Sequence, residues 1–335
     1  MPKRLSQSTV LLPDSPSIKA FSSVVGKLEG DGPLGSFFDF VGKDNTFGEE
    51  SWEKSESRMQ TIACKSVLDK AKTSSKDVDV IFAGDLLNQC IGSTYGLREL
   101  DIPFYGLYGA CSTMAESLSL AALFVESNIA TRALAVTSSH FCSSERQFRF
   151  PLEYGGQRPP TSQWTATGSG AVIVEKSSKP PYVRGICTGK IKDLGITDAN
   201  NMGAAMSPAA CDTIKTYLSD TATTPQDYDM IFTGDLGEVG TTLLYELLEK
   251  ENIDIKGKHS DCGKMLYDME EQDVHSGGSG CGCSASVLCG YILKKIQDGT
   301  YKNVLFAATG ALMSTVSVQQ GESIPGISHL VHLGG

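Results

Sequence analysis

Cys111 has the clearest potential for covalent chemistry in this chain. It stands in the sequence GlyAlaCysSer at 109–112, between a strand-like run at 102–108 and an apolar, helix-like stretch. A thiol at a helix N-terminus has a lowered pKa, because the positive end of the helix dipole favours the thiolate. A strand-to-helix turn also exposes its side chain, so Cys111 is a candidate nucleophile. The alternative is that Cys111 is a small apolar residue that packs a tight turn.

Two aspartates occupy the same place in a repeated sequence. Residues 77–86 read DVDVIFAGDL, and residues 227–236 read DYDMIFTGDL. Each GlyAspLeu follows a continuous apolar run of the kind that is buried in a parallel sheet. The twin positions of Asp85 and Asp235 indicate a structural role for at least one of them, as an acceptor for backbone donors at a strand end.

Several other groups could meet an anionic ligand. Backbone donors are expected at the helix N-terminus at Ser112 and in the glycine-rich turn 277–280, which contains Gly278 and Ser279. Guanidinium groups can clamp carboxylates with two hydrogen bonds. The candidates for that role are Arg146, Arg149 and Arg158.

The histidines and the remaining cysteines carry weaker signals. His140 follows a strand end and His275 precedes the glycine-rich turn, so each could be a ligand contact or a structural hydrogen-bonding residue. Cys281, Cys283 and Cys289 lack a partner pair with the spacing of a four-ligand zinc site. We therefore expect no metal and no cofactor.

Composition narrows the class of protein. The chain has 335 residues, 40% of them hydrophobic, which is enough for a large core. It has no apolar run long enough to span a membrane and no signal-peptide pattern. Ten irregularly spaced cysteines indicate a reducing compartment, and the net charge of −10 argues against nucleic acid as a partner.

The repeat indicates that one α/β unit occurs twice, which predicts parallel sheets with right-handed crossovers. We place the join near 176–181 and expect halves at 1–178 and 179–335. A long polar stretch, 141–166, is expected to be an irregular insertion. The predicted helices are 51–72, 112–126, 208–219, 240–250 and 284–297, and the predicted strands are 8–12, 18–25, 78–83, 102–108, 132–137, 170–175, 182–192, 229–233, 303–309 and 327–332.

The duplicated unit, GlyAlaCysSer before a helix of small residues, and TATGSGAVIVE at 165–175 together resemble the thiolase fold. The size is closest to the ketoacyl synthase III type. The resemblance implies an α/β fold of two pseudo-symmetric halves with layered sheets, and it matches Cys111 to the acyl-accepting cysteine. The expected histidine is absent from 234–240, and the expected histidine or asparagine is absent from 277–284. We therefore do not expect an enzyme.

A narrower resemblance covers the whole chain. GDGPLGS (30–36), AGDLLNQ (83–89), GACSTMAES (109–117), ERQFRFPLEYGGQRPPT (145–161) and GGSGCGCSA (277–285) carry most of it, with TSSHF (137–141), DLGITD (193–198) and DCG (261–263). Together these strings resemble the stage V sporulation protein AD family of spore-forming Firmicutes. The resemblance implies a peripheral component of a spore inner-membrane channel system that binds dipicolinic acid, alone or as its calcium chelate, and supports its uptake into the developing spore.

The resemblance also sets expectations for residues and partners. The expected partners are dipicolinic acid, the membrane subunits of the channel and a second copy of the chain. The second copy would pair through an edge strand of the first half, which we place at 132–137. The enzyme alternative is an acyltransferase that uses Cys111 with His140, His275 or Asp235. The expected ligand-binding residues are Cys111, Ser112, His140, Arg146, Arg149, Asp235, Gly278 and Ser279.

Overall fold

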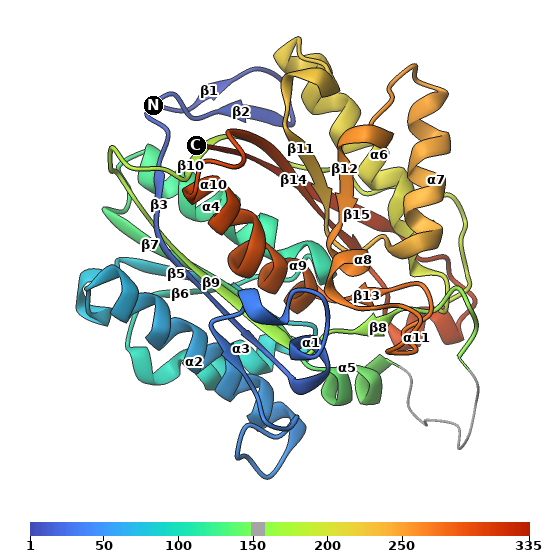
Figure 1. The fold of residues 1–335 in the computed structure, drawn as a ribbon, viewed down its shortest axis with the longest axis horizontal. Helices are drawn as coiled ribbons and strands as arrows, with labels where there is room; N and C mark the ends of the chain where they lie inside the picture. The colour runs from blue at the N-terminus through green and yellow to red at the C-terminus, as the bar shows by residue number, and fades with distance from the viewer. Residues whose placement is uncertain (149–157) are drawn as a thin grey trace.

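The computed structural model describes residues 1–148 and 158–335, and Figure 1 shows their arrangement. The predicted contact of Arg149 with the ligand lies outside the described residues. No helix in the described ranges is long and apolar enough to cross a membrane.

The main sheet contains the same strand pattern twice. In the first half the order from the outer edge is β6 (Phe104–Gly106), β5 (Val80–Gly84), β7 (Arg132–Ser139), β9 (Gly168–Glu175) and β3 (Ser17–Val25). In the second half it is β12 (His259–Asp261), β11 (Met230–Thr233), β14 (Asn303–Ala311), β15 (Gly326–Gly334) and β10 (Tyr182–Cys187). This mirrored order is what a duplication predicts. The boundary at residue 178 stays a prediction.

The repeated GlyAspLeu segments occupy equivalent positions. β5 precedes Asp85 and β11 precedes Asp235, and each is the second strand from the outer edge of its half. Equivalence of 79–83 and 229–233 is therefore confirmed, although neither strand is central. The halves meet in the sheet where β3 pairs with β10 at Ser17 and Tyr182, and β2 (Thr9–Leu11) of the first half also pairs with β10.

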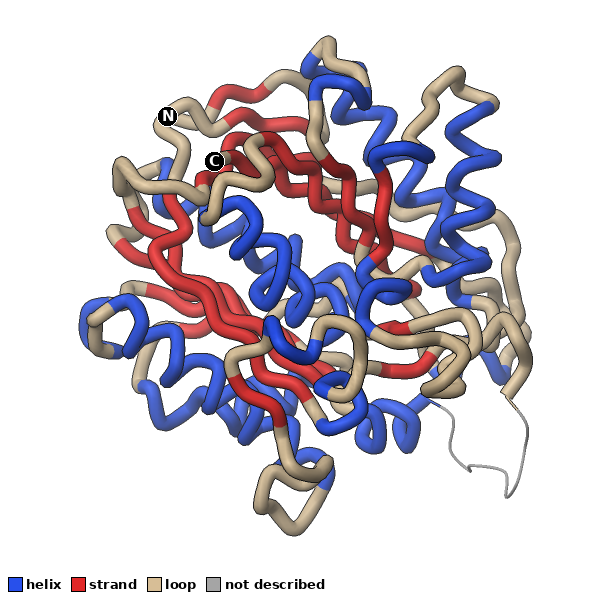
Figure 2. The backbone as a smooth tube through the Cα atoms, in the orientation of Figure 1, coloured by secondary structure: helices blue, strands red, loops and turns tan. Residues whose placement is uncertain are grey.

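Helices lie between the two halves and on both outer faces (Figures 1 and 2). The inner layer contains α4 (Thr113–Glu126) and the continuous run α9 (Cys281–Val287), a π-helical turn (Leu288–Ile292) and α10 (Leu293–Gln297). α4 contacts strands of both halves. The outer faces carry α2 (Trp52–Ala71) and α3 (Ile91–Leu97) on the first half, and α6 (Met202–Thr221) and α7 (Gly237–Glu249) on the second.

Glycines bring α9 close to the first half. A Cβ atom at Gly170 of β9 would lie 2.3 Å from the carbonyl oxygen of Ala285, and one at Gly282 would lie 2.3 Å from that of Gly168. Those distances exclude any side chain at either position. The small residues at 168–170 and 280–285 therefore allow helix and sheet to meet at the level of the cysteine turn.

Most predicted boundaries agree with the structure to within a few residues. α2 begins next to Ser51, as predicted, and the Ser51 side chain caps it by accepting a hydrogen bond from the Lys54 amide. α6 is an exception. We predicted its start at Pro208, but the helix begins at Met202, is capped by the Asn201 side chain and contains Pro208 in its interior. The smaller elements are β1 (Lys3–Arg4), β2 (Thr9–Leu11), α1 (Lys27–Gly30), β4 (Phe40–Val41), α8 (Cys262–Leu266) and α11 (Thr315–Gln319).

Two predictions about the first half were wrong. The stretch 141–166 is not wholly irregular, because it contains α5 (Phe141–Phe148) and β8 (Trp164–Thr165), which pairs with β13 (Gly278–Ser279). The segment 132–137 is not an edge strand. It belongs to β7, which pairs with β5 on one side and with β9 on the other. The outer edge of the first half is β6.

Candidate functional site

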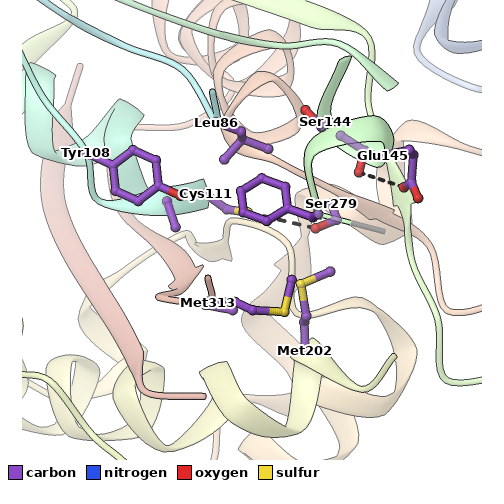
Figure 3. Close-up of a pocket in the computed structure, with 12 residues that line it drawn as sticks. Leu86, Tyr108, Cys111, Ser144, Glu145, Met202, Ser279 and Met313 are labelled. Carbon is purple, nitrogen blue, oxygen red and sulfur yellow. Dashed lines mark hydrogen bonds between the residues drawn. The ribbon is translucent and has the colours of Figure 1, made fainter. Parts of the chain in front are cut away.

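A cavity of about 40 Å³ lies beside Cys111, between elements of the two halves (Figure 3). Its apolar wall is formed by Leu86, Tyr108, Ala110, Phe148, Met202, Ala311 and Met313. Its polar wall is formed by Cys111, Ser144, Glu145, Thr165 and Ser279. A cavity of this size has room for about three water molecules.

Cys111 lies on a tight turn rather than at the first residue of an α-helix. Residues Ala110–Ser112 form a short 3₁₀ turn, and α4 begins at Thr113. Ala110 has a φ of 49°, a left-handed conformation that is rare for a residue with a side chain. The turn directs the Cys111 sulfur into the cavity, 3.9 Å from the hydroxyl oxygen of Ser279.

Asp235 lies directly behind Ser279 and is fully buried. Its Oδ2 accepts hydrogen bonds from the Ser279 hydroxyl at 3.1 Å and from the Gly280 amide at 2.9 Å. Its Oδ1 accepts one from the Thr309 hydroxyl at 2.7 Å. Burial raises the pKa of Asp235 to about 6, although these hydrogen bonds favour its ionised form. Cys111, Ser279 and Asp235 therefore form one polar cluster.

This cluster disfavours a thiolate. Burial raises the pKa of the Cys111 thiol well above its ordinary value, and the Asp235 carboxylate raises it further. The prediction of a lowered pKa at a helix N-terminus was wrong. Ser112 contributes no free donor, because its amide and its hydroxyl both bond to the Gly109 carbonyl.

The two repeated aspartates have different roles. Asp85 accepts hydrogen bonds from the Leu87 and Ser93 amides, so the predicted structural role is confirmed for this copy. In the second half Asp261 takes over that role and accepts from the amides of Leu236 and Gly237. Asp235 is consequently free to turn toward Ser279.

A second buried acidic group supports the wall of the cavity. Glu56 of α2 accepts hydrogen bonds from the Ser138 hydroxyl at 3.0 Å and from the Ser143 hydroxyl at 2.7 Å. Ser143 belongs to α5, the helix that contributes Ser144, Glu145 and Phe148 to the cavity. Glu56 thereby fixes the position of that helix.

The structure does not bring the predicted histidines and Arg146 to the cavity. His140 bonds to the Asn45 carbonyl at 2.7 Å, and burial lowers its pKa. His275 lies 3.7 Å from Asp273 in an ion-pair geometry. Arg146 pairs with Glu53 on the surface. Arg158 lies over the Trp164 ring and donates to the Gln163 carbonyl.

The glycine-rich turn also differs from the prediction. The Gly280 amide bonds to Asp235, the Gly282 amide to the Ser139 hydroxyl, and the Gly277 amide to the Val274 carbonyl. Gly278 lies in β13, and its carbonyl accepts from Gln163. These groups hold the turn together and are not available to an anion. Of the predicted residues that the structure describes, Cys111 and Ser279 line the cavity.

Most of the cavity wall has no signal in the sequence. Phe148, Thr165, Met202 and Met313 come from four separate elements and loops, and no local pattern links them. Tyr108 could have been predicted from the sequence, because it lies three positions before Cys111, between β6 and the cysteine turn.

Comparison with known proteins identifies the family. The model of the family described as "Stage V sporulation protein AD (SpoVAD)" matches residues 6–334. The chain belongs to the stage V sporulation protein AD family. The protein of that name from Bacillus subtilis (strain 168) is 43% identical over 312 residues, which is 93% of this chain and 92% of that protein.

Solved structures show the same fold at low identity. The 3-oxoacyl-[acyl-carrier-protein] synthase III of Aquifex aeolicus VF5 has a TM-score of 0.59 at 14% identity and covers 96% of this chain and 100% of that one. A substituted form of OleA from Xanthomonas campestris has a TM-score of 0.60 at 12% identity and covers 96% of this chain and 98% of that one. The predicted thiolase-like fold of the ketoacyl synthase III type is therefore confirmed over nearly the whole chain.

Proposed function

We propose that this protein binds dipicolinic acid in the Cys111 cavity without chemical turnover and supports its uptake into the developing spore. Family membership is one support, since the family resemblance is the basis for this ligand. The proposed absence of turnover rests on one observation, which is that Cys111 is grouped with Asp235 and Ser279. A nucleophilic thiol needs a neighbouring base that can accept its proton and tolerate the thiolate. A buried carboxylate beside Cys111 opposes the thiolate instead.

The lining of the cavity contains groups that suit a planar aromatic acid. Tyr108 and Phe148 offer aromatic rings, and the wall also contains the hydroxyl groups of Ser279 and Thr165, which donate to Asp235 and Glu145 in the ligand-free protein. A volume of about 40 Å³ is too small for a pyridine ring with two carboxylates. Met202 and Met313 are flexible side chains that could make room by changing rotamer. Figure 3 shows both methionines on the same wall.

Isothermal calorimetry with two isomers tests the binding. Pyridine-2,6-dicarboxylate should bind, and pyridine-3,4-dicarboxylate should bind at least about tenfold more weakly, a difference of about 1.4 kcal/mol. The reason is that only the 2,6 arrangement places a carboxylate on each side of the ring nitrogen. Equal affinity for both isomers, or no binding of either, would remove the proposal.

The acyltransferase alternative predicts a covalent intermediate on Cys111. Incubation with acyl-CoA and intact-mass measurement should show no acyl adduct on the parent protein. An adduct on the parent protein that is absent from Cys111→Ala would instead support the acyltransferase alternative.

We place the protein at the spore inner membrane as a peripheral partner of the channel subunits. Membership of the stage V sporulation protein AD family supports that placement.

A further inference from the structure

In the described part of the Cys111 cavity, a buried carboxylate, that of Asp235, lies close to the space that a ligand would enter. Glu145 lines the cavity, and Asp235 lies one hydrogen bond behind its wall, through Ser279. Among the described residues that line it there is no lysine, arginine or histidine. A dicarboxylate that enters this space therefore comes close to a buried carboxylate.

The neighbours of Asp235 do not neutralise it. Its hydrogen-bond donors are the neutral groups of Ser279, Gly280 and Thr309. The titratable groups that interact with it are Asp261 on β12 and the thiols Cys111, Cys262, Cys281 and Cys283 on the turns and helices packed around it. Within residues 1–148 and 158–335, no cationic side chain pairs with its carboxylate.

We propose that Asp235 makes ligand binding proton-coupled, so that the cavity takes up one proton from the solvent with each dicarboxylate dianion. This inference rests on the proposed function, since it concerns the charge state in which that ligand is held. The proton forms an O–H bond on the Asp235 carboxylate, and no other covalent bond changes.

Protonation also releases a donor toward the ligand. In the ligand-free protein the Ser279 hydroxyl donates its hydrogen to Asp235 Oδ2. A protonated Asp235 can donate to the Ser279 oxygen instead, which leaves the Ser279 hydrogen free for a ligand carboxylate. One proton thus removes a repulsion and supplies a hydrogen bond.

The direction of the pH dependence follows from linkage. The pKa of Asp235 is about 6 in the ligand-free protein, and a nearby dianion raises it further. Affinity is then full below the ligand-free pKa, falls as the pH rises toward the ligand-bound pKa, and levels off above it. Between the two values it falls by up to about tenfold per pH unit.

Calorimetry in buffers of different ionisation enthalpy counts the protons. At a pH about one unit above 6, the parent protein should take up close to one proton per pyridine-2,6-dicarboxylate bound. Asp235→Asn should take up close to none and should bind with an affinity that hardly changes with pH. Asp85→Asn is the matched control, because it makes the same change in the equivalent GlyAspLeu turn of the first half. It should keep the proton uptake of the parent.

The outcomes separate the two proposals. Binding by the parent without proton uptake would overturn the coupling and leave the proposed function intact. Absence of binding at every pH would remove both. Uptake that survives in Asp235→Asn but is lost in Asp85→Asn would overturn the assignment to Asp235. If Asp235→Asn does not fold, as circular dichroism would show, the proton count and the pH profile of the parent still decide whether uptake occurs.

Discussion

Two opposing effects act on the Cys111 thiol. A helix N-terminus stabilises a negative charge by about 0.3 to 1 kcal/mol, which is less than about one pKa unit. Full burial shifts a pKa by up to about 3 to 5 units in the opposite direction, and here the Asp235 carboxylate adds to it. The effect of burial is therefore the larger one, and the pKa of the Cys111 thiol is raised. The sequence pattern showed the helix but not the depth of the side chain.

Alkylation of the native protein tests this conclusion. Iodoacetamide reacts with thiolates, so Cys111 should react at least about tenfold more slowly at neutral pH than Cys142, which is only half-buried. Peptide mass spectrometry over time gives both rates. In denaturant the two cysteines should react alike, which controls for sequence effects. Preferential labelling of Cys111 in the native protein would show that it is an activated nucleophile.

At the scale of elements, α5 is held in place by contacts to α2. Glu56 accepts from Ser143, and Glu53 pairs with Arg146, so two residues one turn apart on α2 fix the cavity wall. Burial and the neighbouring Asp85 raise the pKa of Glu56 to about 8. The folded state therefore binds a proton at Glu56 that the unfolded chain releases near an ordinary carboxyl pKa of about 4.3.

This linkage has a defined sign. The stability that the proton on Glu56 provides is present at acidic pH and is lost as the pH rises from about 4.3 to about 8. Glu56→Gln should therefore be more stable than the parent at pH about 8.5, by on the order of a few kcal/mol, and similar to it near pH about 4.5. Urea unfolding at the two pH values measures the difference.

Glu53→Gln is the control for this prediction, because it changes a partly exposed ion pair on the same helix. Its effect should stay below about 1 kcal/mol at both pH values. A Glu56→Gln variant that is equally destabilised at both pH values would show that Glu56 is ionised in the folded protein.

The elements that the sequence predicted well share a physical signal. β5 and β11 are continuous apolar runs, and α2 has a serine cap, so local composition was sufficient. α5 is a polar helix that owes its place to Glu56, and α6 contains a proline that its packing tolerates. Cys111 and Ser279 could be predicted because they lie on marked turns. The remaining cavity wall could not, because tertiary contacts alone bring its elements together.

At the scale of the whole molecule, the outer edges of the two halves differ. Both residues Phe104 and Tyr105 of β6 are exposed, with 40% and 53% of their surface accessible, and the backbone of β6 has no neighbour on its outer side within the described chain. The equivalent strand β12 carries the polar residues His259, Ser260 and Asp261. An aromatic edge strand without a partner favours pairing with another strand.

We therefore propose that two copies of the chain pair along β6, in place of the interior strand at 132–137. The protein should have the mass of a dimer in light scattering at about 10 µM, which is well above the dissociation constant of a dimer with submicromolar affinity. Tyr105→Lys should shift it toward the monomer, because a lysine on an edge strand opposes strand pairing through its charge and its hydration.

Ile129→Lys gives the matched comparison for this test. Ile129 is an exposed apolar residue outside β6, with 66% of its surface accessible, so the same change of charge there should leave the dimer intact. Circular dichroism of both variants separates dissociation from unfolding. A parent protein that is monomeric at this concentration would exclude the dimer. A Tyr105→Lys variant that remains as dimeric as Ile129→Lys would show that the two copies meet through another face, and that the aromatic edge of β6 has a different partner.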